Sequence, residues 1–78
     1  MEVKKFYRTQ REVASVVNEI IDDYWADKLT DEELETIITM IYENNLDKIK
    51  KNNEYTTIIK QQCGKNQLTV VSKITKNR

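Results

Sequence analysis

Apolar residues in the first third of the chain recur three and four positions apart, as they do along one face of a helix. A capping box, Thr9 to Glu12, stands at the start of this stretch, where its side chains can bind free backbone N–H groups. The pattern predicts a helix over residues 10–27. Its apolar stripe consists of Val13, Val16, Val17, Ile20, Ile21 and Tyr24.

A second capping box, Thr30 to Glu33, follows within a few residues, and its acidic residues suit the positive end of a helix dipole. Asn44-Asn45 is a suitable stop, because Asn tolerates the left-handed conformation that closes many helices. We therefore predict a second helix over residues 31–44, which forms a hairpin with the first. Its apolar positions are Leu34, Ile37, Ile38 and Ile41.

The segment after the second helix is rich in Lys and Asn and has two readings. Leu46 and Ile49 are three positions apart, which fits either one helical turn held against the core or a plain connector. No alternation of apolar and polar residues occurs, and neither Asn-Gly nor Asp-Gly is present. We therefore expect no β-hairpin.

The last third of the chain predicts two short helices. Thr56 or its neighbour is placed to cap a helix over residues 56–63, and Gly64, the only glycine, is expected to end that helix in the left-handed conformation. Asn66 is then the expected cap of a helix over residues 66–76. The fold class is therefore all-α, with two longer helices and two or three short ones in an orthogonal or bundle-like arrangement.

The length of 78 residues suits a single domain over residues 1–78, with fraying expected at residues 1–8 and 76–78. A chain of this size buries only about 60 per cent of the surface that it exposes when unfolded. Its stability margin is correspondingly thin. Association with a partner or with a second copy is therefore an option from the start.

The composition argues against most catalytic and metal chemistry. The chain has no His and a single Cys, Cys63, so a Cys/His or Ser/His pair, a disulfide within the chain and a thiolate zinc site are all excluded. The acidic residues lack the spacing of a calcium loop. We expect no enzyme, no cofactor and no metal. No apolar run approaches the roughly 20 residues of a membrane span, and we expect a cytoplasmic protein.

Charge is distributed unevenly although its sum is zero. Residues 1–47 contain 12 acidic and 5 basic side chains, whereas residues 48–78 contain 1 acidic and 8 basic side chains. Such a polarity suits head-to-tail association, a basic half that faces an anionic partner, or packing of one half on the other.

The acidic half offers one candidate surface, at the joint of the first two helices. It suits contact with a basic partner or mimicry of a phosphate backbone, although a solvated face that stabilises helix ends explains the same residues. Adjacent aromatic residues near the joint point about 100° apart on a helix, so one of them is either an exposed interface anchor or a cover for the helix seam. The candidate partner surface comprises Asp22, Asp23, Tyr24, Trp25, Asp27 and Asp31.

The basic half offers a second candidate surface, which partly resembles a DNA-binding helix-turn-helix centred on Gly64. Lysines would contact phosphates and polar side chains would read base edges. Lysines also occupy positions where that motif has small or apolar residues, and a solvated face is the alternative. The candidate nucleic-acid surface comprises Lys60, Lys65, Asn66, Gln67, Lys73 and Lys76.

Six short segments, most of them polar, follow one another along the chain. They are Asp-Asp-Tyr-Trp, Leu-Thr-Asp-Glu-Glu, Glu-Asn-Asn-Leu-Asp-Lys-Ile, Lys-Asn-Asn-Glu-Tyr-Thr, Ile-Lys-Gln and Gly-Lys. Together they resemble a family of small uncharacterised proteins from Firmicutes and their phages. The resemblance covers nearly the whole chain and implies a one-domain helical form, but it carries no activity and no functional residues.

The sequence therefore predicts a small binding protein. The first hypothesis is a protein-interaction module or small regulator, whose partner is another protein or a second copy that forms a homodimer. The alternative is nucleic-acid binding through the basic half.

Overall fold

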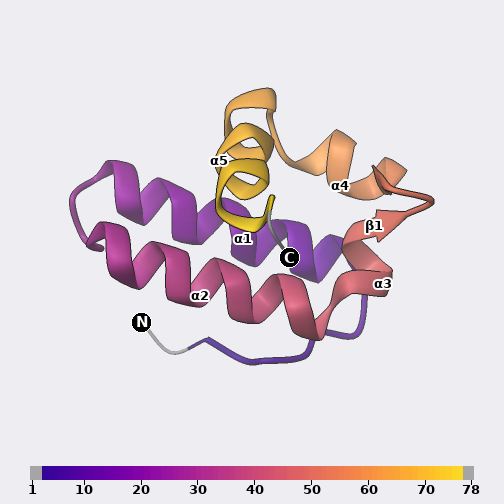
Figure 1. The fold of residues 1–78 in the computed structure, drawn as a ribbon, viewed down its shortest axis with the longest axis horizontal. Helices are drawn as coiled ribbons and strands as arrows, with labels where there is room; N and C mark the ends of the chain where they lie inside the picture. The colour runs from indigo at the N-terminus through magenta and orange to yellow at the C-terminus, as the bar shows by residue number, and fades with distance from the viewer. Residues whose placement is uncertain (1–2, 77–78) are drawn as a thin grey trace.

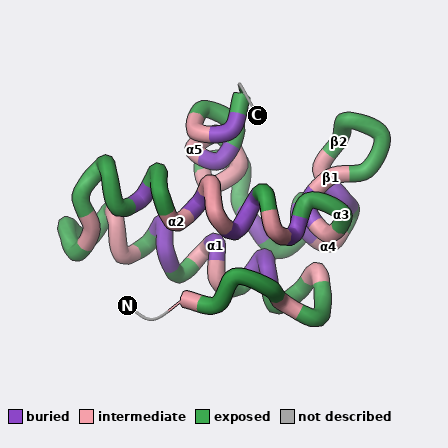
Figure 2. The backbone as a smooth tube through the Cα atoms, turned by 60° about the horizontal axis from the view of Figure 1, so that its bottom comes forward, coloured by how far each residue is buried: buried purple, intermediate pink, exposed green. Residues whose placement is uncertain are grey.

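Five helices account for most of residues 3–76, which are the residues that the computed structural model describes. Helices α1 and α2 run antiparallel and side by side, and α5 crosses over the pair (Figures 1 and 2). The predicted all-α class is confirmed, with the addition of one very short hairpin of strands. The elements are α1 (Gln10–Trp25), α2 (Asp31–Asn44), α3 (Leu46–Ile49), β1 (Lys50–Lys51), β2 (Glu54–Tyr55), α4 (Thr57–Gln62) and α5 (Lys65–Thr75).

Both predicted capping boxes are present and set the starts of the two long helices. The Glu12 backbone N–H donates to Thr9 Oγ1 at 3.1 Å, and the Thr9 N–H donates to Glu12 Oε1 at 3.2 Å. The same pair of bonds joins Thr30 and Glu33 at 3.1 and 2.9 Å. Each box satisfies backbone donors that have no partner inside the helix.

The first helix ends two residues earlier than predicted. Trp25 is its last residue, Ala26 is the C-cap, and Asp27 adopts a positive φ of 63°. Asp is one of the few residues other than Gly that enter this left-handed region without great cost. The chain can therefore turn sharply between α1 and α2 without a glycine.

Asn45 ends α2 by a mechanism that differs from the predicted one. Its φ is −132°, so the expected left-handed closure is wrong. Its side chain is instead fully buried: Oδ1 accepts from the Tyr7 N–H at 3.0 Å, and Nδ2 donates to the Lys5 and Ile41 carbonyls at 2.8 and 2.9 Å. A segment 40 residues away along the chain is thereby tied to the end of α2. Of the residues expected to fray, 1, 2, 77 and 78 lie outside the described part.

The connector after α3 forms an antiparallel hairpin, so the expectation of no strands is wrong. Lys50 on β1 lies opposite Tyr55 on β2, with its Nζ 4.8 Å from the centre of the tyrosine ring. Asn52 and Asn53 make the turn with φ values of 54° and 67°. Two successive positive φ values are the requirement of a type I′ turn, which Asn-Asn meets without glycine.

The two last helices are joined by only two residues, and the predicted role of Gly64 is wrong. Gly64 has a φ of −71° and precedes the first residue of α5, so it begins that helix instead of ending α4. Asn66 therefore lies in the first turn of α5 and is not its cap. Thr56 precedes α4 as predicted, but its hydroxyl donates to the Lys48 carbonyl at 2.9 Å and not to the helix.

All five helices contribute to one buried cluster, and buried positions occur along each of them (Figure 2). Helix α4 packs mainly against α1, and α5 packs mainly against α2. This arrangement leaves the outer faces of α2 and α5 exposed. The cluster includes Val13, Ile20, Ile21, Ile38, Ile41, Ile59 and Val71.

Candidate functional site

The acidic joint brings part of the predicted partner surface together. The Tyr24 hydroxyl donates a 2.5 Å hydrogen bond to Asp31 Oδ1, and this bond raises the pKa of Tyr24 because it favours the protonated phenol. Asp23 lies 3.9 Å from the Lys28 ammonium. Of the aromatic pair, Tyr24 packs against the core, whereas Trp25 is 50 % exposed. Several of these groups are thus already paired with one another. Asp22 and Asp27 are exposed to solvent.

The basic half contains an open groove of about 710 Å³, formed where β2, α4 and α5 meet. Its lining is mostly apolar, while exposed lysines stand around its edge. We call this feature the lysine groove. Its edge carries Lys60, Lys65, Lys73 and Lys76, and its wall is formed by Tyr55, Cys63, Leu68, Thr69 and Ser72.

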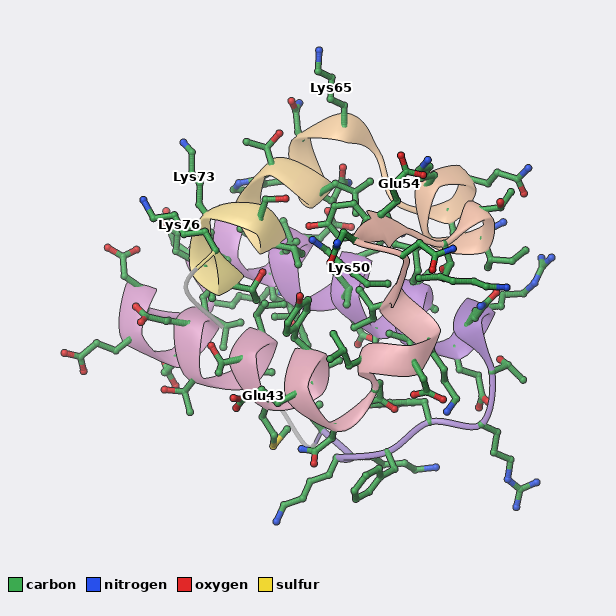
Figure 3. All side chains as sticks on the ribbon, turned by 45° about the vertical axis from the view of Figure 1, so that its right-hand side comes forward. Glu43, Lys50, Glu54, Lys65, Lys73 and Lys76 are labelled. Atoms are coloured by element: carbon green, nitrogen blue, oxygen red, sulfur yellow. The ribbon has the colours of Figure 1, made fainter. Side chains whose placement is uncertain are left out.

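Lys65 and Lys73 of α5 and Lys76, the C-cap of that helix, project into solvent (Figure 3). Among residues 3–76, the ion pairs join Lys28 with Asp23 and Lys48 with Asp47. The groove lysines therefore have no carboxylate partner within the described chain. Their charge is available to an anionic ligand that also offers apolar surface.

Tyr55 gives the groove a fixed aromatic wall. Its hydroxyl hydrogen-bonds to Ser72 Oγ at 2.6 Å and lies 3.5 Å from the Leu68 carbonyl, so β2 is held against α5. The Lys50 ammonium above the same ring adds a cation–π contact. These contacts join residues 13 to 17 positions apart and fix the shape of the groove.

Cys63 contributes packing to the groove and not reactivity. The thiol is only 3 % exposed, and Sγ lies 3.7 Å from the Ala14 carbonyl oxygen, to which it donates. Burial raises the pKa of this thiol to about 11. The thiolate is the nucleophilic form, so at neutral pH the sulfur behaves as a small apolar group.

The outer face of α2 carries a second hollow, of about 490 Å³, whose lining is mostly polar. Glu32 and Glu43 stand at its ends and Thr36 and Thr39 lie between them. The Thr39 hydroxyl oxygen is buried and has no hydrogen-bond partner in the part of the chain that the structure describes. Within residues 3–76, no group of three His, Cys, Asp or Glu side chains is placed to hold a metal ion.

The structure divides the residues of the predicted nucleic-acid surface. It brings the four lysines, which come from two helices, around one groove, but Asn66 and Gln67 do not line it. Sequence reasoning missed the groove wall, above all Tyr55 and Ser72. Tyr55 is brought to α5 by the β-hairpin, which the sequence pattern did not predict.

The chain matches the family CLB_0814_fam, described as conserved hypothetical protein, over residues 4–76. It belongs to this family. The match includes every helix and strand described above. This agrees with the resemblance to an uncharacterised family over nearly the whole chain, whereas a phage origin stays a prediction.

Neither the curated proteins nor the solved structures contain a match to the chain. Among residues 3–76, every helix is too short or too polar to cross a lipid bilayer.

Proposed function

We propose that this protein is a cytoplasmic protein-interaction module that binds an acidic, partly apolar segment of its partner in the lysine groove. The observation that carries the proposal is the convergence of four lysines without ion-pair partners in residues 3–76 around a mostly apolar hollow. An apolar side chain of the partner would enter between Tyr55 and Leu68, and its carboxylates would meet the lysines at the edge.

Burial and charge support a protein ligand of this kind. Binding energy at protein interfaces is concentrated in apolar side chains that fill pockets, while charges at the edge steer association and set specificity. The groove has both parts. At the acidic joint, in contrast, Tyr24 is bonded to Asp31 and Asp23 is paired with Lys28, which leaves fewer groups for a partner. Burial raises the pKa of the Cys63 thiol, which disfavours a role for Cys63 as a nucleophile.

The connection between α4 and α5 favours this proposal over DNA reading. A helix-turn-helix uses a turn of three or four residues, often with glycine, and inserts the second helix into the major groove. The connection consists of Cys63 and Gly64 alone, and Gly64 has an ordinary negative φ. The four lysines also surround a mostly apolar hollow, which suits an apolar side chain of a protein partner.

The test uses a fluorescent helical peptide of repeating Glu and Leu as probe, with poly-glutamate and duplex DNA as competitors. We expect saturable binding of the Glu-Leu peptide, with amide shift changes at Leu68, Thr69 and Ser72 in NMR spectra. Poly-glutamate should compete weakly because it lacks an apolar side chain. Binding of duplex DNA alone, with a steep loss of affinity as salt rises, contradicts the proposal and favours the nucleic-acid alternative.

Matched variants assign the binding to the groove. Lys65→Glu with Lys73→Glu should lower peptide affinity by about tenfold or more, because both attraction and steering are reversed. Leu68→Ala should weaken the Glu-Leu peptide but leave poly-glutamate unchanged. Lys4→Glu with Lys5→Glu is the control, since it changes the net charge by the same amount at two exposed positions of the N-terminal segment outside the groove. Equal losses of peptide affinity in this control and in the groove variant would show that only net charge matters.

A further inference from the structure

The lysine groove is bordered by one face of α5 that has a regular pattern. Lys65, Thr69, Ser72 and Lys76 follow one another at intervals of four, three and four residues, and all four are exposed. Residues at this spacing lie in one row along a helix. The row thus has a positive charge at each end and two small hydroxyl side chains between the charges.

The acidic hollow on α2 is built on the same pattern with the opposite sign. Glu32, Thr36, Thr39 and Glu43 follow at the same intervals, with a carboxylate at each end and two threonines between. In both rows the end charges are separated by three helical turns, or about 16 Å along the axis. Small residues in the middle of each row let two helix axes approach closely, because the distance between packed helices depends on the side chains at the contact.

One end charge of each row is placed against the dipole of its own helix. Lys65 is the first residue of α5, at the end where the helix dipole is positive, and Glu43 is in the last turn of α2, where the dipole is negative. The first turn of α5 contains no acid that would offset Lys65, and the last turn of α2 contains no base that would offset Glu43. An antiparallel contact between the two rows would place Lys65 beside Glu43 and Lys76 beside Glu32, and would relieve both conflicts.

The two rows cannot meet within one molecule. They share no lining residue, and Figure 3 shows the α5 lysines projecting well away from Glu43 on α2. Each row therefore faces solvent on its own side of the chain.

We propose that the partner held at the lysine groove is a second copy of this chain, which presents the outer face of α2 antiparallel to α5. This inference rests on the proposed function and specifies its ligand. The contact is head-to-tail, because it joins two different surfaces. Each added copy leaves one groove and one acidic row open, so association continues into short open chains unless the rotation between copies closes a ring.

The test is a mixing experiment with two variants, followed by sedimentation velocity. The groove variant carries Lys65→Glu and Lys76→Glu, and the row variant carries Glu32→Gln and Glu43→Gln. The wild type should associate as its concentration rises and dissociate as salt rises. Each variant alone should be a monomer. Their mixture should form one-to-one dimers and nothing larger, because only one groove and one complementary row remain intact.

Controls separate this contact from general charge effects. Lys4→Glu with Lys5→Glu changes net charge as much as the groove variant does, at exposed positions outside both surfaces, and should associate like the wild type. Circular dichroism of every variant checks that the fold is retained. A groove variant that associates like the wild type, or a mixture that stays monomeric while the wild type associates, overturns the inference.

The same measurements distinguish failure of this inference from failure of the proposed function. A wild type that is monomeric at every concentration in low salt rules out the second copy as partner. If that monomer still binds the Glu-Leu peptide in the lysine groove, the groove is an interaction site for a different protein. If it binds neither, both proposals fail.

Discussion

The two halves of this small fold are held together in different ways. In the α1–α2 hairpin, each helix begins with a capping box whose partners are three residues apart. No such side-chain cap is present at the start of α3, α4 or α5 within residues 3–76. Those elements depend on distant residues instead: Asn18 Nδ2 of α1 donates to the Gln62 carbonyl at the end of α4 at 2.7 Å. The first half is encoded locally, and the second is assembled on it.

The charged residues of the two halves also differ in their effect on helix stability. Acids in the first turn of α2, namely Asp31, Glu32 and Glu33, stabilise a helix N-terminus whether or not a partner exists. In α5, Lys73 lies in the last turn and suits the helix dipole, whereas Lys65 in the first turn opposes it. Charge that costs stability and has no internal partner is the charge that points most directly to binding.

Replacement of Asn45 should give the largest loss of stability, because its buried side chain ties the N-terminal segment to the end of α2. Asn45→Ala removes three hydrogen bonds from a fully buried position and should lower the free energy of unfolding by about 3 kcal/mol in urea titrations. Asn44→Ala is the matched control. It removes a single bond to the Met40 carbonyl and should cost about 1 kcal/mol or less. Equal losses of unfolding free energy in the two variants would show that the buried Asn45 hydrogen bonds contribute no more than the single Asn44 bond.

The Cys63 thiol should make the second half sensitive to alkali. Below pH 9 the thiol is protonated in both states, whereas between pH 9 and 11 the unfolded chain releases the proton and the buried thiol retains it. Stability is therefore lost as pH rises through this window, by about 2–3 kcal/mol. Cys63→Ala should lack this loss. Urea titrations of both proteins at pH 8 and pH 11 measure it, and parallel curves for the two would contradict the burial of the thiol.

Loss of one capping box should have a moderate and local effect. Thr30→Ala removes the hydroxyl that accepts from Glu33 and should cost about 1 kcal/mol, with faster amide exchange in the first turn of α2. Thr30→Ser retains the oxygen and should restore most of the stability. If Thr30→Ala loosens α5 as much as α2, the caps are not local and the contrast between the halves fails.

Substitution of Gly64 should have the smallest effect. Its φ of −71° suits any residue, and a new Cβ would meet the movable end of the Gln67 side chain, whose Oε1 atom would lie 2.5 Å away. Gly64→Ala should therefore change the free energy of unfolding by about 0.5 kcal/mol or less. The double variant with Gln67→Ala removes even that contact. A loss of more than about 1 kcal/mol would support the left-handed helix end predicted from sequence.

The elements that could be predicted are those whose signals lie within one or two helical turns. Thr9 with Glu12 and the apolar stripe after them located α1 to within two residues at its end. The roles of Asn45, Gly64 and the Asn52-Asn53 turn were not predicted correctly. Asn is compatible with a left-handed cap, a turn or a buried amide, and only distant neighbours such as Lys5 and Tyr7 select among these roles.

The sequence alone determined that the chain is helical, that its first half is an acidic capped hairpin, and that four lysines concentrate near its end. Helix propensity, capping and charge are properties of neighbouring residues, so they can be read along the chain. Only the tertiary structure decided that those lysines surround one apolar groove. Burial against α1 and α2, together with the Tyr55–Ser72 contact, sets the directions of α4 and α5, and these contacts join residues that are distant in sequence.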